Sequence, residues 1–122
     1  MQIDDEEFQQ MIDRAFDSLP KEHRDNVSNV AIVYENDPSP EQRMQLQLRD
    51  DQSLFGLYQG VPLARRQGMA SQLPDKITIF KNPLLQASNS LHQLQSNVRR
   101  TLWHEVAHYY GLNHDQIEKL ER

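Results

Sequence analysis

The sequence contains no cysteine, and this absence removes two classes of structure at once. Disulfide bonds cannot form, and zinc sites built from thiolate ligands are excluded. Any metal bound by this chain must take its ligands from His, Asp, Glu or water. The 5 histidines are therefore the first residues to inspect for a metal site.

Two further absences narrow the cellular setting and the partners. A helix that spans a bilayer needs about 20 apolar residues, and no apolar run in the sequence approaches this length. The N-terminal stretch MQIDDEEFQQ also lacks the hydrophobic segment of a secretory signal. We therefore expect a cytoplasmic protein that does not enter the membrane. Basic residues are fewer than acidic residues: the sequence has 13 Lys and Arg and 18 Asp and Glu, which gives a formal net charge of −5. An acidic surface disfavours phosphate backbones, so nucleic acid is not expected as a partner.

The remaining composition is typical of one small folded domain, which we predict over residues 1–122. Apolar residues recur with helical spacing over residues 4–19, ahead of Pro20, and again between a cap at Ser88 or Ser90 and Tyr110. Residues 27–35 and 76–80 are predicted strands, and residues 54–59 a strand or an irregular extended segment. Residues 41–49 are predicted as a short helix or loop, and residues 61–74 as a long loop. A short helix is expected over residues 115–120. This order predicts an α+β fold, with a short mixed sheet packed against helices.

The segment from His104 to His114, HEVAHYYGLNH, carries the strongest chemical signal. His104 and His108 are four residues apart, so a helix places them on one face, away from its apolar stripe and toward a cleft. Glu105 can then reach a metal-activated water without ligating the metal. A turn at Gly111 would return His114 to the same ion, and three protein ligands leave a position open for chemistry.

These residues fit the HExxHxxGxxH pattern of the metzincin zinc peptidases. The chain also resembles a small bacterial family of minimal zincin-like metallopeptidases, in VAIVYE, LFGLYQGVPL, LPDKITIFKNPLL and the pair Arg99-Arg100 before TLWHEVAHYYG. The resemblance implies a small zincin-like domain, in which a zinc peptidase site is formed on the last long helix. It implies zinc ligands at His104, His108 and His114, a general base at Glu105, and a peptide or protein substrate. Asp is common at the third ligand position of this family, so Asp115 is the alternative to His114.

One departure from the metzincin pattern keeps other functions open. Metzincins carry a methionine-containing turn after the third histidine, whereas the residues DQIEKLER after His114 contain no methionine. One alternative is therefore a metal-binding interaction module with little or no peptidase activity. A second is a metal-dependent ribonuclease, because a bacterial ribonuclease family shares the histidine spacing. That family has Gly at the position of Glu105, which counts against this alternative.

Three weaker features concern substrate binding. Tyr58, Tyr109 and Tyr110 have the chemistry of oxyanion donors, although core packing is the favoured interpretation for each. Strand 76–80 would pair with an extended peptide if it lay at a sheet edge. Arg99-Arg100 could contact a substrate carboxylate, but a solvated basic pair is the favoured interpretation.

Overall fold

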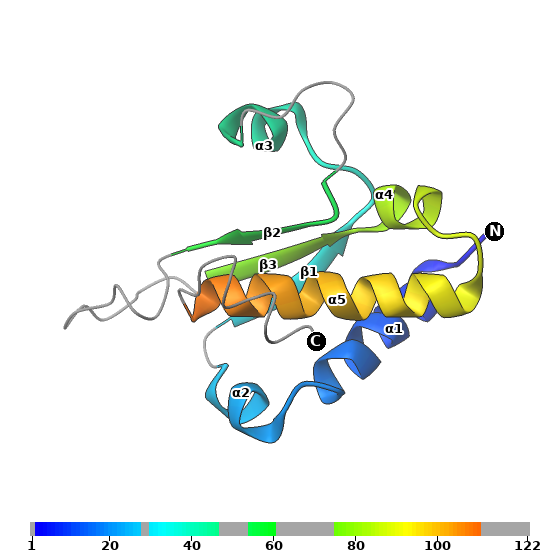
Figure 1. Ribbon diagram of the computed structural model, residues 1–122. Coiled ribbons are helices and arrows are strands. Elements are labelled where there is room, and N and C mark those ends of the chain that lie inside the picture. Colours follow the sequence, from blue (N-terminus) through cyan, green and yellow to red (C-terminus); the bar gives the residue numbers. More distant parts are fainter. Residues whose placement is uncertain (1, 28–29, 47–53, 61–74, 111–122) are drawn as a thin grey trace.

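The computed structural model of the chain describes residues 2–27, 30–46, 54–60 and 75–110. Within these ranges the elements are α1 (Asp5–Asp17), α2 (Lys21–Asn26), β1 (Val30–Glu35), α3 (Pro40–Gln45), β2 (Gly56–Gln59), β3 (Asp75–Phe80), α4 (Lys81–Gln86) and α5 (Leu91–Tyr109). Figure 1 shows the long helix α5 running alongside the strands, with α1 crossing next to it. The predicted α+β fold, with a short mixed sheet against an N-terminal helix and the helix of the motif, is confirmed.

The sheet has three strands in the order β1-β3-β2. β1 pairs with β3 in parallel, from Val30 opposite Asp75 to Glu35 opposite Phe80, and β2 pairs with β3 antiparallel. β3 therefore has both edges occupied by other strands. The condition under which residues 76–80 would pair with a peptide is not met, because that role requires a strand at the edge. The edge strand that contacts α5 is β2.

The core lies between the sheet and the two longest helices. Side chains alternate between the faces of a strand, so Ile77 and Ile79 of β3 point to the same side. Both are fully buried against side chains of α1 and α5. The buried helical residues in this cluster are Phe8, Met11, Ile12, Ala15, Leu94, Val98, Leu102 and Val106. Leu91, the first residue of α5, belongs to the predicted apolar stripe but is 48% exposed.

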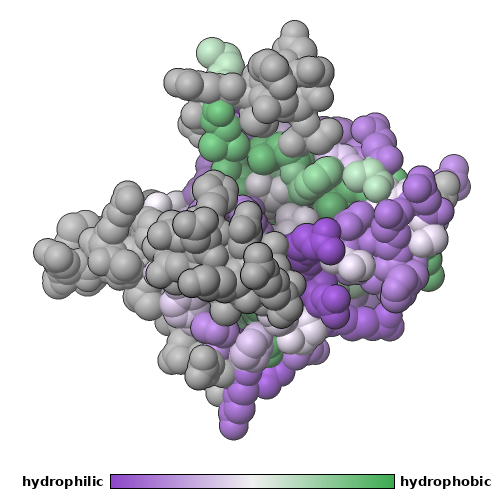
Figure 2. All heavy atoms as spheres, in the orientation of Figure 1, coloured by the Kyte–Doolittle hydropathy of each residue, from purple (hydrophilic) through white to green (hydrophobic). Residues whose placement is uncertain are grey.

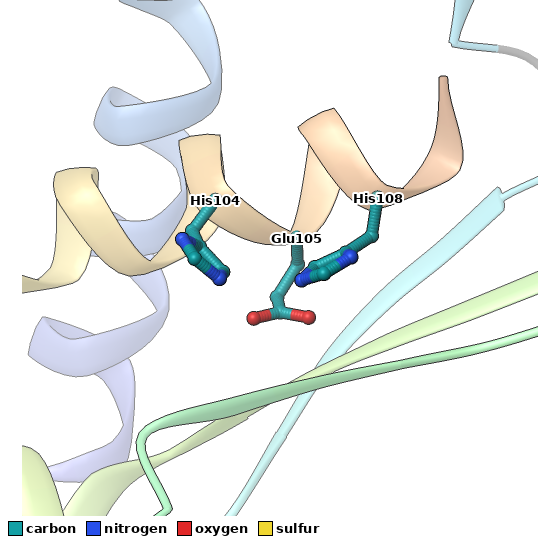
Figure 3. A group of neighbouring side chains, drawn as sticks. All are labelled: His104, Glu105 and His108. Atoms are coloured by element: carbon teal, nitrogen blue, oxygen red, sulfur yellow. The ribbon is translucent and has the colours of Figure 1, made fainter. Parts of the chain in front are cut away.

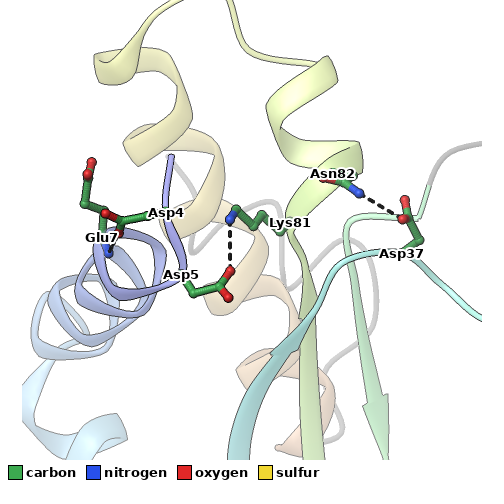
Figure 4. Close-up of polar contacts among 6 residues, drawn as sticks. All are labelled: Asp4, Asp5, Glu7, Asp37, Lys81 and Asn82. Atoms are coloured by element: carbon green, nitrogen blue, oxygen red, sulfur yellow. Dashed lines mark hydrogen bonds and ion pairs between the residues drawn. The ribbon is translucent and has the colours of Figure 1, made fainter. Parts of the chain in front are cut away.

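Polar contacts fix the beginning of α1 against the junction between β3 and α4 (Figure 4). Asp4 caps α1 by accepting a hydrogen bond of 2.8 Å from the backbone N–H of Glu7. Lys81, whose side chain is nearly buried, forms an ion pair of 3.0 Å with Asp5. Because Lys81 directly follows the central strand, this ion pair ties α1 to the sheet that carries the core.

Two short helices were not expected from the sequence. α2 is polar and carries no apolar stripe, and α4 contains Pro83. Pro83 is the third residue of α4, where a backbone N–H has no partner inside the helix, so proline causes no loss of a hydrogen bond. β1 and β2 each begin later than predicted, and residues 41–49 contain the helix α3. The loop predicted over residues 61–74 and the helix predicted over residues 115–120 lie outside the described residues. No helix in the described part of the chain is both long and apolar enough to cross a bilayer.

Candidate metal centre

Helix α5 presents two faces with different surroundings, as its helical wheel predicts. Ser90 caps the helix by accepting a hydrogen bond of 3.1 Å from the backbone N–H of Gln93, so the helical register is set from this point. One face is buried in the core described above. The other face lines a cleft with the side chains of Arg100, Thr101, His104, Glu105 and His108.

The side chains of His104, Glu105 and His108 converge on this second face. Their potential ligand atoms all lie within 4.8 Å of one another, and the two imidazole rings are 4.8 Å apart between centroids. Figure 3 shows all three leaving α5 on the same side, with the carboxylate of Glu105 between the two rings and directed toward the strands. The structure therefore brings together the three residues of the motif that fall within its described ranges.

The chemistry of this donor group fits a zinc ion. Neutral imidazole nitrogens are preferred zinc ligands, and bonds of about 2.0–2.1 Å place two such nitrogens roughly 3.3 Å apart in a tetrahedral site. The potential ligand atoms of the three residues all lie within 4.8 Å of one another, and this upper limit is compatible with a nitrogen–nitrogen spacing of that size. Gly111, His114 and Asp115, on which the third ligand depends, lie outside the described residues.

Burial changes the acid–base behaviour of Glu105. Its side chain is only 7% exposed, and burial raises the pKa of its carboxyl group from the ordinary 4.5 to about 7. The physical cause is the cost of removing a carboxylate from water. A hydrogen bond with the backbone of Tyr58 acts in the opposite direction and lowers the pKa, but desolvation is the larger effect. Glu105 is therefore poised to exchange a proton near neutral pH.

The strand β2 approaches α5 closely at Gly56, and this approach encloses Glu105. A β-carbon built at position 56 would lie 2.7 Å from Cγ2 of Thr101 and 3.2 Å from Cγ of Glu105. Any larger residue here would require a shift of the Thr101 side chain or of the backbone, so glycine is the residue that fits this approach as it stands. The glycine within the strand-like stretch LFGLYQ is the sequence signal that could have indicated such an approach.

The cleft between β2 and α5 has a volume of about 570 Å³. Its polar floor is formed by the motif residues, and its apolar wall by Leu46, Leu54, Phe55 and Leu57. In Figure 2, hydrophobic residues gather between α3 and α5, next to a strongly hydrophilic surface. The sequence did not indicate this apolar wall, because it combines one residue that follows α3, two that precede β2 and one within β2.

The three tyrosines considered as oxyanion donors have other contacts. The hydroxyl of Tyr58 donates to Asp75, and that of Tyr110 donates to the backbone oxygen of His23 at 2.9 Å. Tyr109 is buried, and its ring packs against the rings of Tyr58 and Tyr110. These contacts support the packing interpretation for all three residues.

Comparison with known proteins gives one family and one fold. A family model described as "Zincin-like metallopeptidase" matches residues 27–122. Among solved structures, the chain is similar to a conserved hypothetical protein from Thermo thermophilus, with a TM-score of 0.57 and 20% sequence identity over 95% of each chain. At this identity the similarity shows the fold alone. No curated protein matches the chain.

Proposed function

The chain belongs to the zincin-like metallopeptidase family, and from this premise we propose that it is a zinc-dependent peptidase. It hydrolyses peptide bonds with a metal-activated water and uses Glu105 as the general base. In this proposal His104 and His108 hold the zinc ion together with His114, for which Asp115 is the substitute. The observation that carries the proposal is the convergence of His104, Glu105 and His108 on the floor of an open cleft.

The roles of the side chains follow from their positions. When bound, zinc supplies Lewis acidity that polarises a substrate carbonyl and makes water more acidic. Glu105 lies between the two histidines and accepts the proton of the attacking water, then delivers it to the leaving amine.

The sheet suggests how a peptide would lie in the cleft. β2 pairs with β3 along one edge and, among the described residues, has no strand on the other. An extended peptide that adds to this free edge would form backbone hydrogen bonds and lie beside the floor of the cleft. Backbone pairing is independent of side chains, so it would hold a peptide bond near Glu105 in many sequences.

The test is an unbiased peptide-library cleavage assay on zinc-loaded protein, combined with metal analysis. Glu105→Gln should bind zinc as the unmodified protein does and lose hydrolysis by about 10²–10⁴-fold, the usual contribution of a general base. Glu6→Gln, the same chemical change at an exposed position of α1, should have no effect. Retained hydrolysis in Glu105→Gln would refute the role of the base. Zinc binding without any hydrolysis by the unmodified protein would instead favour the metal-binding module.

A further inference from the structure

Two adjacent arginines of α5 face different hollows of the surface. Arg100 lines the cleft described above, one helical turn before His104. Arg99 lines a separate hollow between α1 and α5, together with Arg14 and His92. The pair predicted as a solvated basic patch is thus divided by the turn of the helix, and only one member belongs to the candidate site.

Arg100 has a distinctive place in the cleft. It is the one Arg or Lys among the described residues of the lining, and the one Asp or Glu among them is Glu105. Arg100 forms no ion pair or hydrogen bond with any residue in the described part of the chain. The facing wall is apolar, with Leu54 and Phe55 next to β2. A guanidinium group offers several N–H donors arranged to bind both oxygens of a carboxylate.

We propose that Arg100 binds a carboxylate group of the peptide substrate, while an apolar side chain of that peptide packs against Leu54 and Phe55. This inference rests on the proposed peptidase function and names the class of peptide that the cleft accepts. The carboxylate is either the free C-terminus or the side chain of Asp or Glu. A free terminus would make the protein an exopeptidase, and a side chain would make it an endopeptidase with a preference for acidic sequences.

The geometry also limits where in the peptide the carboxylate stands. Arg100 and His104 are four positions apart in the helix, which corresponds to about 6 Å along the axis of α5. β2 and α5 run side by side (Figure 1), so a peptide added to β2 would follow the same direction. An extended chain advances about 3.3 Å per residue. The carboxylate therefore belongs within about three residues of the bond that is cleaved.

The experiment measures binding in the Glu105→Gln background, where no hydrolysis interferes. The probes are fluorescent leucine-containing peptides of one sequence, prepared as the free acid, as the C-terminal amide, and as amides with Glu or Gln at each position in turn. Fluorescence polarisation is recorded with chelator and again with zinc, because a carboxylate that binds zinc directly would discriminate only in the presence of the metal. Thermal unfolding confirms that each variant is folded.

We expect at least one carboxylate peptide to bind about fivefold more tightly than its neutral counterpart, which is the upper range for an exposed ion pair. This difference should disappear in Arg100→Gln, return in part in Arg100→Lys and decrease with added salt. Arg99→Gln, the adjacent exposed arginine, should retain it in full. Discrimination by the free acid identifies the C-terminus as the source, and discrimination by an internal Glu identifies the side chain.

Three results would overturn the inference. They are equal binding of acidic and neutral peptides, equal losses in Arg99→Gln and Arg100→Gln, and the absence of any peptide binding. The proposed function has its own readout in the cleavage assay. Carboxylate discrimination through Arg100 without cleavage by the zinc-loaded protein would refute peptidase activity and leave Arg100 as a peptide-binding residue.

Discussion

The close approach of β2 to α5 allows a quantitative prediction for Gly56→Ala. Alanine in a strand is favoured over glycine by about 0.5–1 kcal/mol, because the unfolded chain loses less entropy on folding. The added β-carbon, however, would lie 2.7 Å from Cγ2 of Thr101. Threonine in a helix has few allowed rotamers, so this methyl group cannot easily move, and overpacking of this kind costs about 1–3 kcal/mol. We expect a net loss of about 1–2 kcal/mol in the free energy of unfolding.

A double-mutant cycle with Thr101→Ser isolates the responsible contact, since serine lacks the methyl group in question. In that background the same Gly56→Ala change should be close to neutral, because the clash with the methyl group is gone and the entropic gain offsets the remaining tight contact with Glu105. The assay is urea unfolding of all four proteins in the presence of a metal chelator, with circular dichroism as the probe. Peptide hydrolysis should be lower in Gly56→Ala than in the unmodified protein. It should recover only in part in the double mutant, because the contact of 3.2 Å with Cγ of Glu105 is still present.

Two outcomes of the double-mutant cycle would refute this reasoning. If Gly56→Ala destabilises equally in both backgrounds, within about 0.5 kcal/mol, Thr101 is not the residue that the new β-carbon meets. If Gly56→Ala stabilises the unmodified protein, β2 does not approach α5 as closely as the structure shows.

Two other predictions concern the metal and the buried carboxyl group. Zinc at 100 times its dissociation constant should stabilise the fold by about 2.7 kcal/mol in thermal or chemical unfolding. This effect should be lost in His104→Ala and kept in His92→Ala, an exposed histidine of the same helix; equal behaviour of both variants would contradict the ligand assignment. In metal-free protein, the folded-state pKa of Glu105 is raised from 4.5 to about 7, so the folded state holds this proton more tightly than the unfolded chain does. The contribution of Glu105 to stability should therefore be fully present below about pH 4.5 and be lost, by up to about 3 kcal/mol, as the pH rises to 7, whereas Glu105→Gln should lack this pH-dependent loss.

The sequence predicts the two long helices, α1 and α5, for a local reason, whereas it did not indicate the short helices α2 and α4. The stripe of Phe8, Met11, Ile12 and Ala15 indicates α1 and its buried face, and both are observed. Asp4 and Asp5 were both candidates for the cap, and the structure shows Asp4 in this position. The same reasoning places His104 and His108 one turn apart, because helical geometry fixes the relation of residues four positions apart. Apolar periodicity and capping depend on neighbours in the sequence, and these were available without a structure.

Strand order and the apolar wall of the cleft were not predictable in this way. The alternation in residues 76–80 indicates a strand, yet nothing in those residues distinguishes a central strand from an edge strand. β3 is central because β1 and β2 pair on its two sides, and these pairs join residues that are far apart in the chain. Likewise Leu54 and Phe55 have no pattern that distinguishes the wall of a cleft from an ordinary core.

The candidate site has a local part, formed by neighbouring residues of α5, and a distant part, formed by β2 and the residues before it. The two parts determine different properties of the site. The local part, His104, Glu105 and His108, determines which ion and which proton transfer are available, so the motif alone could indicate the reaction type. The distant part determines how acidic Glu105 is and what lies beside it. Burial under β2 raises the pKa of Glu105, and Gly56 permits that burial. In our proposal, substrate preference belongs to the same distant part, because Arg100 lines the same cleft as residues that precede β2. If the proposed function is correct, we therefore expect a protein with the same motif but a different neighbouring strand to keep the chemistry and to accept different peptides.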